Sequence, residues 1–121
     1  MTVKKFSSIF DGLQEAYGTY RIEKTQSNGK NTGKAGIVRE PRNAGLWQGH
    51  LSGKGNSIGI IPINADNMCK WGCVDIDQYP LDHKLLLEKI RKLKLPLVVC
   101  RSKSGGAHCF LFCKDWVEAK D

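Results

Sequence analysis

The stretch CVDIDQYPLDHKLLLEKIRKLKLPLVVCRSKSGGAHCFLFC, residues 73–113, decides the fold. It begins at residues 73–77 with an alternation of apolar and acidic side chains. Because successive side chains of a strand point to opposite faces, the apolar residues are predicted to share one face, and Asp75 and Asp77 the other. The two carboxylates are therefore expected to lie side by side.

A helix and two further strands are predicted after this first strand. Asp82 is suited to cap a helix that reaches about Lys94, because the apolar residues between them recur at helical spacing. Residues 97–101 are rich in β-branched side chains and predict a buried strand. Residues 102–106 contain two glycines and predict a turn, after which residues 107–113 predict a strand antiparallel to the second.

The β-α-β order brings distant polar residues to one edge of the sheet. A right-handed crossover makes the first two strands parallel, so that their ends lie at the same edge. If the third strand lies between them, as in ferredoxin-like sheets, its beginning lies there too, and His108 comes close to Asp75 and Asp77. Two acids, an imidazole and a two-glycine turn then converge as an active site requires.

Signals are weaker in the remainder of the chain. Residues 26–34 predict a mobile loop, residues 57–63 a short buried strand, and the residues from Lys114 onward the first turns of another helix. Apolar residues three and four apart predict an N-terminal helix ended by Gly18. These residues are Phe6, Ile9, Phe10, Leu13 and Tyr17.

Composition bounds the class of protein. A chain of 121 residues suits one compact domain, and its net charge of +7 favours anionic partners such as nucleic acid or nucleotides. No apolar run approaches the roughly 20 residues needed to cross a membrane, so the protein is expected to be cytoplasmic. Five cysteines without a secretory signal indicate free thiols in a reducing compartment.

The residues at the predicted edge of the sheet are suited to bind a cation and phosphate groups. Two adjacent carboxylates repel each other unless a cation lies between them, and ligation by oxygen favours Mg²⁺ or Mn²⁺. The glycines of the turn leave backbone N–H groups able to cradle phosphate oxygens, and Arg101 and Lys103 add positive charge. His108 can donate a hydrogen bond to a phosphate. An ordinary glycine hairpin with exposed acids is the alternative for each feature taken alone.

The order VDID, helix, strand and RSKSGGAHCFLF resembles motifs I and II of the archaeo-eukaryotic primase superfamily. Upstream, HLSGK at residues 50–54 and IGIIP at residues 58–62 look like the lead-in of the primase domains of TOTE conflict systems and of related phage and plasmid primase-polymerases. The resemblance covers about residues 45–113. It implies an α+β fold in which an N-terminal α/β module joins a partial RRM-like, split β-α-β catalytic core, with the active site between them.

On that resemblance, residues 1–121 are interpreted as a single primase-polymerase-type domain. Residues 1–67 would form the N-terminal module, and residues 68–121 would form the first part of the catalytic core. A third acidic motif has no counterpart before Asp121. The chain is therefore expected to be a fragment of a longer enzyme, encoded by a host or by a phage or mobile element, or a short derivative that binds without full catalysis.

The resemblance also implies an activity and roles for the residues. The activity would be metal-dependent, template-directed nucleotidyl transfer from ribo- or deoxyribonucleoside triphosphates on single-stranded DNA, as in a DNA primase, with a helicase or further domains as partners. Asp75 and Asp77 would hold catalytic Mg²⁺ or Mn²⁺, and His108 would be catalytic and bind the triphosphate. The residues expected to assist in nucleotide binding are Arg101, Lys103, Ser104, Gly105 and Gly106.

Three other interpretations remain open. Four thiols at C-x₃-C spacing suggest zinc, but residues four apart in a strand lie about 13 Å apart, which favours buried free thiols. A non-catalytic module for single-stranded nucleic acid would bind without metal, through aromatics and lysines. A nuclease also uses paired acids with metal, although the turn beside His108 suits a triphosphate better than a cleaved strand.

Overall fold

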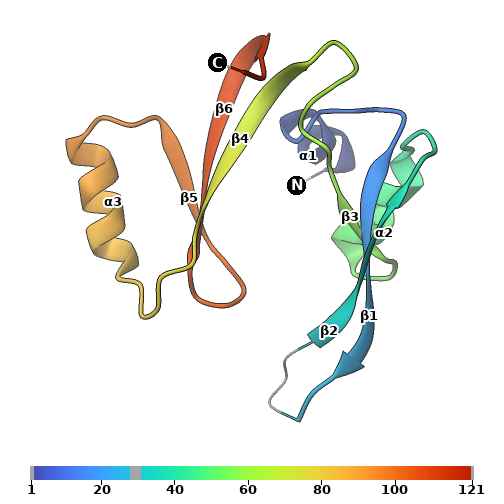
Figure 1. Ribbon diagram of the computed structural model, residues 1–121, viewed down its shortest axis with the longest axis horizontal. Coiled ribbons are helices and arrows are strands. Elements are labelled where there is room, and N and C mark those ends of the chain that lie inside the picture. The colour runs from blue at the N-terminus through green and yellow to red at the C-terminus, as the bar shows by residue number, and fades with distance from the viewer. Residues whose placement is uncertain (1, 28–30, 121) are drawn as a thin grey trace. The chain divides into compact units, whose positions relative to one another are not determined.

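The chain forms an α+β structure of two compact units, as its computed structural model shows (Figure 1). The structure describes residues 2–27 and 31–120. One unit comprises Met1–Cys69 with Val117–Asp121, and the other comprises Lys70–Trp116. The predicted α+β class is confirmed, with one three-stranded sheet made chiefly by each unit. Within the described residues, no helix is both long enough and apolar enough to cross a membrane.

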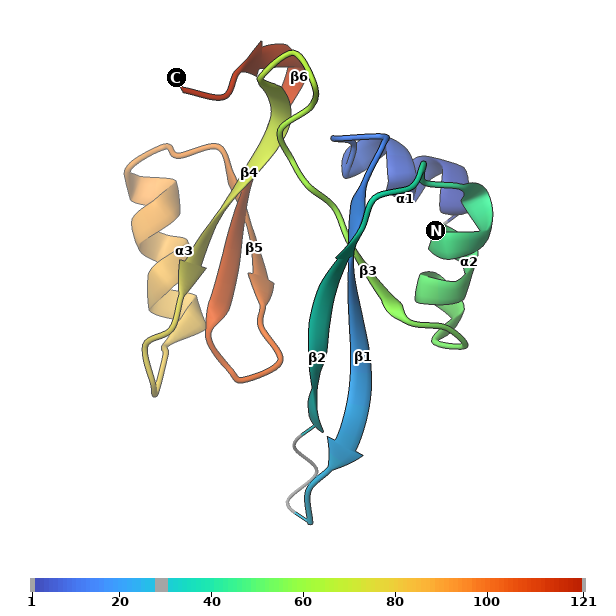
Figure 2. The same cartoon turned by 45° about the vertical axis from the view of Figure 1, so that its right-hand side comes forward.

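The sheet of the first unit is built on a long hairpin, seen clearly in Figure 2. Strand β1 (Tyr17–Thr25) is central and pairs antiparallel with β2 (Asn31–Val38) and β3 (Ser57–Gly59). Gly18 lies opposite Gly59, and a Cβ on Gly18 would come 3.5 Å from the Cα of Gly59. This distance is an ordinary van der Waals contact, so the pairing of β1 with β3 does not itself require glycine at residue 18.

Two short helices complete the first unit. Helix α1 (Val3–Ile9) is capped by Thr2, and α2 (Ala44–Ser52) begins after an Asn43 cap whose side chain accepts a hydrogen bond from the backbone of Leu46. The ring of Phe6 packs edge-on against the ring of Trp47 at 5.7 Å between centroids. Trp47 is buried, and this contact joins the two helices.

The N-terminal helix ends much earlier than predicted. It stops at Ile9, and the backbone N–H of Leu13 then donates to the carbonyl of Ile61 at 2.9 Å. A Cβ on Gly12 would overlap the same carbonyl oxygen, so the chain passes too close to residue 61 for a continued helix. Tyr17 and Gly18, predicted as the helix end, instead begin β1. A partner distant in the sequence has overridden the local apolar spacing.

Two further predictions for the first unit were wrong in part. Strand β2 begins at Asn31, so residues 31–34 of the predicted loop belong to the hairpin, while residues 28–30 lie outside the described residues. The strand predicted for residues 57–63 is regular only over Ser57–Gly59, where Ile58 alone is half-buried. The reason is that β3 lies at the sheet edge and pairs with only three residues of β1.

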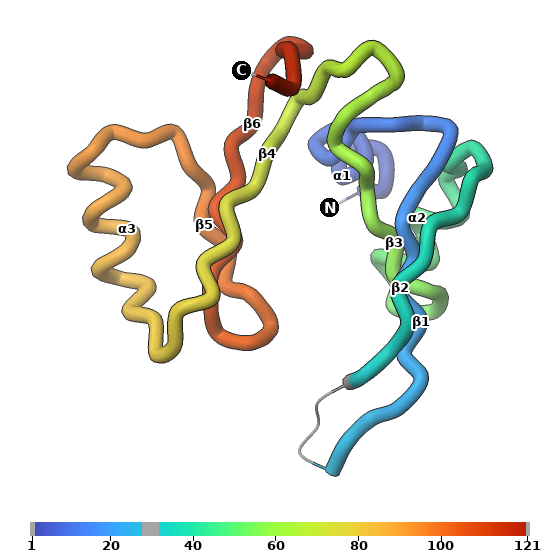
Figure 3. Tube along the Cα trace, viewed as in Figure 1, coloured from blue at the N-terminus to red at the C-terminus, as the bar shows by residue number. Residues whose placement is uncertain are grey.

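The second unit has the β-α-β-β order predicted from its sequence, and Figure 3 follows the chain through it. Strand β6 lies between β4 and β5, and is antiparallel to β5 with Cys100 opposite His108. The strand order on which the meeting of the acids and His108 depends is therefore confirmed. The elements are β4 (Met68–Ile76), α3 (His83–Lys92), β5 (Leu97–Arg101) and β6 (Ala107–Glu118).

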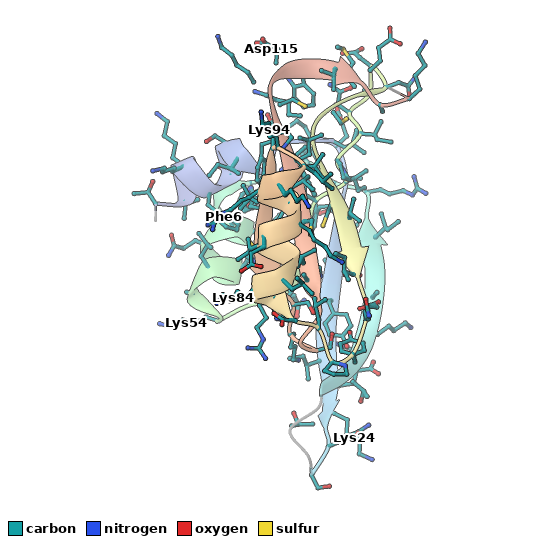
Figure 4. The ribbon with its side chains drawn as sticks, turned by 90° about the vertical axis from the view of Figure 1, so that its left-hand side faces the viewer. Phe6, Lys24, Lys54, Lys84, Lys94 and Asp115 are labelled. Atoms are coloured by element: carbon teal, nitrogen blue, oxygen red, sulfur yellow. The ribbon has the colours of Figure 1, made fainter. Side chains whose placement is uncertain are left out.

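Helix α3 covers one face of this sheet. Figure 4 views the structure from the side on which α3 lies, with Lys84 near the beginning of the helix and Lys94 just beyond its end. The predicted cap is confirmed, since the carboxylate of Asp82 accepts from the backbone of Leu85 at 3.0 Å. A small core forms beneath the helix, in which the half-buried partners include Ile76, Leu86, Leu97 and Val99. The buried residues are Ile90, Ala107 and Cys109.

The helix predicted from Lys114 onward is wrong. Residues 114–118 continue β6, and the backbone N–H of Ala119 donates to the carbonyl of Asn67 at 2.9 Å. The ammonium of Lys70 lies 5.8 Å from the centre of the Trp116 ring. Because β4 begins earlier than predicted, it provides a strand partner for these residues, and sheet pairing decides their conformation.

Candidate active site

Asp75 and His108 meet across the neighbouring strands β4 and β6. The Nε2 atom of His108 lies 3.5 Å from Oδ1 of Asp75, and the side chains are 44% and 57% exposed. An ion pair forms there when the imidazole is protonated, but such an exposed pair contributes at most about 1 kcal/mol to stability. The main effect of the arrangement is therefore to place a hydrogen-bond donor beside an accessible carboxylate.

Asp77 follows the last residue of β4. Its side chain is linked to the β5–β6 turn through the hydroxyl of Tyr79. Its Oδ1 accepts a hydrogen bond of 2.8 Å from the hydroxyl of Tyr79. The same hydroxyl oxygen lies 2.8 Å from Oγ of Ser104, which in turn lies 3.2 Å from Oγ of Ser102. The second acid of the D-x-D motif and the predicted phosphate-binding turn are thus joined by one continuous hydrogen-bond chain.

The turn itself is closed by its own backbone. Ser102 N–H donates to the carbonyl of Gly106 at 2.9 Å, and Gly105 N–H donates to the carbonyl of Ser102 at 3.1 Å. Gly105 has φ +97°, a conformation that other residues rarely adopt. Within the described residues, the amides of Lys103 and Ser104 have no backbone partner and remain available to a ligand.

The turn is also fixed to β4 and α3. Gly106 packs so closely on the carbonyl of Ile76 that a Cβ would overlap its oxygen, and Ile76 is the residue between the two acids. From α3, Nε2 of His83 lies 2.9 Å from the carbonyl oxygen of Gly106. A carbonyl only accepts, so Nε2 of His83 carries the hydrogen. The position of the turn relative to the acids is therefore set by backbone contact.

The two predicted cations differ in their placement. Arg101 is exposed and pairs in register with Ala107, so strand alternation directs it to the opposite face from His108. Lys103 is exposed within the turn. The structure therefore gathers Asp75, Asp77, His108 and the turn at one end of the sheet, whereas Arg101 reaches that region only from the face covered by α3.

The donor set suits a hard divalent cation. Within the described parts of the chain, no group of three or more His, Cys, Asp or Glu side chains is close enough to hold a metal ion. Asp75 and Asp77 supply carboxylate oxygens, the ligands that Mg²⁺ prefers, and nucleotide sites commonly add only phosphate and water oxygens to one or two carboxylates. The oxygen chemistry of the two acids is therefore compatible with such an ion.

The cysteines of the chain were considered above as possible zinc ligands. All five cysteines are free. Burial, and next the charge of Cys100, raise the pKa of Cys109, while burial and next the charge of Asp75 raise the pKa of Cys73. Among the described residues, the C-x₃-C thiols do not come together in a group of three or more that could hold a metal ion, so the zinc interpretation finds no support.

Three residues at this end of the sheet were not identified from the sequence. Tyr79 and Ser102 take part in the chain of hydroxyls, and His83 holds the turn. Hydroxyl side chains are common in turns, and a histidine in the first turn of a helix has no distinctive spacing. No sequence signal marks these three residues, because the contacts of Tyr79 with Ser104 and of His83 with Gly106 join segments more than 20 residues apart.

The sequence was next compared with known families. A sequence model of the family described as TOTE conflict system, Archaeo-Eukaryotic Primase domain, matches residues 20–121. The matched range contains β4, α3, β5 and β6, and with them Asp75, Asp77 and His108. Among curated proteins, no significant match was found.

Proposed function

This chain belongs to the archaeo-eukaryotic primase domain family of TOTE conflict systems, and from that premise we propose that it binds a nucleoside triphosphate with Mg²⁺ or Mn²⁺ for template-directed nucleotidyl transfer. The observation that carries the proposal is the meeting of His108 with Asp75 at 3.5 Å. It supports a site in which a phosphate donor and metal-binding carboxylates act on the same ligand.

Each residue has a role that follows from its atoms. Asp75 and Asp77 offer carboxylate oxygens to the cation, and His108 donates its Nε2 hydrogen to a phosphate oxygen. The amides of Lys103 and Ser104, with the lysine side chain, hold further phosphate oxygens. Because Gly106 packs against the carbonyl of Ile76, the turn that carries these donors lies beside the strand that carries Asp75.

The proposed reaction is a displacement at phosphorus. A 3′-hydroxyl oxygen attacks the α-phosphorus of the triphosphate, the bond to the bridging oxygen breaks, and pyrophosphate leaves while the hydroxyl proton passes to solvent. A divalent cation, when bound, supplies neutralisation of the charge that develops on the phosphate oxygens. His108 and the turn orient the triphosphate for this attack.

The proposed partners are a single-stranded DNA template and further domains, including a helicase, of a longer chain. The net charge of +7 supports an anionic template. In this proposal, residues 1–67 are the N-terminal module, and residues 68–121 are the first part of the RRM-like core.

Calorimetric titration of the chain with a deoxynucleoside triphosphate, with and without Mn²⁺, tests the site. We expect binding that requires Mn²⁺ and is lost in the Asp75→Asn, Asp77→Asn double variant. The matched control is Asp115→Asn, which makes the same change at an exposed aspartate of β6 (Figure 4) and leaves binding unchanged. Circular dichroism checks that each variant is folded.

Two results would overturn the assignment. Triphosphate binding that survives in the folded double variant would place the ligand elsewhere. Binding of single-stranded DNA that is equal with Mn²⁺ and with a chelator, without any triphosphate binding, would favour a non-catalytic nucleic-acid module.

A further inference from the structure

Tyr79 occupies a bridging position that neither sequence motif contains. Its hydroxyl lies 2.8 Å from Oδ1 of Asp77 and 2.8 Å from Oγ of Ser104. The two partners come from the segment after β4 and from the β5–β6 turn, which lie at the same end of the sheet in Figures 1 and 2. Tyr79 therefore joins the two parts of the proposed site through one oxygen atom.

The number of hydrogens fixes the direction of the chain. A carboxylate only accepts, so the single hydroxyl hydrogen of Tyr79 is donated to Asp77. Ser104 must then donate to Tyr79, and because its only hydrogen is used there, Ser102 must donate to Ser104. All three hydroxyls point their hydrogens along the chain toward Asp77. Ser104 consequently directs lone pairs, and no hydrogen, toward any ligand above the turn.

We propose that Tyr79 is a positioning residue that couples metal binding at Asp77 to triphosphate binding at the turn. The inference rests on the proposed function, because it assigns a relay between the two halves of that site. A cation on Asp77 withdraws charge from Oδ1 and weakens the hydrogen bond from Tyr79. Tyr79 then no longer requires the hydrogen of Ser104, and Ser104 can donate it to a phosphate oxygen.

The relay makes the coupling reciprocal. A triphosphate that draws the Ser104 hydrogen away makes Tyr79 a weaker donor to Asp77, and the Asp77 carboxylate then keeps more negative charge for a cation. By linkage, each ligand must raise the affinity for the other by the same factor. Tyr79 is 53% exposed, so the hydroxyl is not needed to fill the core and its position is explained by these two partners.

The test measures the coupling factor and not affinity alone. The dissociation constant of deoxyadenosine triphosphate is measured by calorimetry at a low and at a saturating Mn²⁺ concentration, in the wild type and in Tyr79→Phe. We expect the affinity gain from Mn²⁺ to fall at least about fivefold in Tyr79→Phe, the lower end of typical coupling factors. Tyr20→Phe, which makes the same change in β1, is the control and should keep the wild-type gain.

Ser104→Ala provides the second arm. It should reduce the gain as Tyr79→Phe does, and the double variant should show no further loss, because both changes interrupt one chain. Equal losses of affinity at low and at saturating Mn²⁺ in Tyr79→Phe would overturn the relay and leave Tyr79 a structural residue. Additive losses in the double variant would also overturn it. Failure of the wild type to bind triphosphate in any condition would overturn the proposed function itself.

Discussion

Gly106 lies against the carbonyl of Ile76, and the contact leaves no room for a Cβ. This backbone contact connects the turn that precedes His108 to the residue that separates the two acids of β4. The geometry of the candidate site is therefore determined by main chain as well as by side chains.

Gly106→Ala should displace the turn from β4. We expect the free energy of unfolding to fall by about 1–3 kcal/mol, as overpacking typically costs, and triphosphate affinity to fall with it. Gly72→Ala is the matched control. Gly72 lies in β4, and a Cβ there would meet no atom within 4 Å. Urea denaturation measures stability. Equal stabilities of the two variants would contradict the close contact.

His108→Gln should weaken triphosphate binding and leave the stability of the fold nearly unchanged. The pair with Asp75 is exposed, so its loss should change the free energy of unfolding by less than about 1 kcal/mol. Triphosphate affinity in the presence of Mn²⁺ should fall about tenfold, because the donor to phosphate is displaced. A large loss of stability with unchanged affinity would instead show that His108 is structural.

His83 should stabilise the turn by donating to the Gly106 carbonyl. This carbonyl accepts from both Ser102 and His83, so His83→Ala removes one of two partners from a buried group. We expect a loss of about 1 kcal/mol in urea denaturation. His83→Gln keeps a donor of similar reach and should recover part of the loss. The prediction fails if the alanine and glutamine variants have the same stability.

Cys109 should make stability depend on alkaline pH. Burial raises its pKa in the folded chain above the ordinary value of 9.0, so the folded state holds this proton more tightly than the unfolded state. The associated stability is fully present below pH 9 and is lost as the pH rises through the folded pKa. Denaturation at several pH values should therefore show a steeper alkaline loss for wild type than for Cys109→Ala. Parallel curves would contradict the raised pKa.

Local signals predicted the second unit well. The Asp82 cap and the strand at residues 97–101 each depend on residues that are close together in the sequence, and the structure confirms both. Alternation also placed Asp75 where His108 reaches it, once the central position of β6 was assumed. Alternation, capping and β-branched runs involve residues only a few positions apart, so they can be recognised from the sequence.

Features that depend on distant partners could not be predicted. Tyr17 fits a helical stripe, but its pairing with Val38 places it in a sheet. Residues 114–118 resemble a helix start, yet they extend β6 beside β4. The hydroxyl chain through Tyr79 and the contact between Gly106 and Ile76 similarly join segments about 25 to 30 residues apart, and no periodicity reports such approaches.

The two adjacent glycines of the turn differ in the replacements that they permit. Gly105 has a φ of +97° and open space around it, so another residue there is strained by its backbone alone, and asparagine is the least strained replacement. Gly106 needs the absence of a side chain, which only glycine provides. A saturation library of residues 105 and 106, selected for folded protein, should therefore recover a few amino-acid types at residue 105 and only glycine at residue 106.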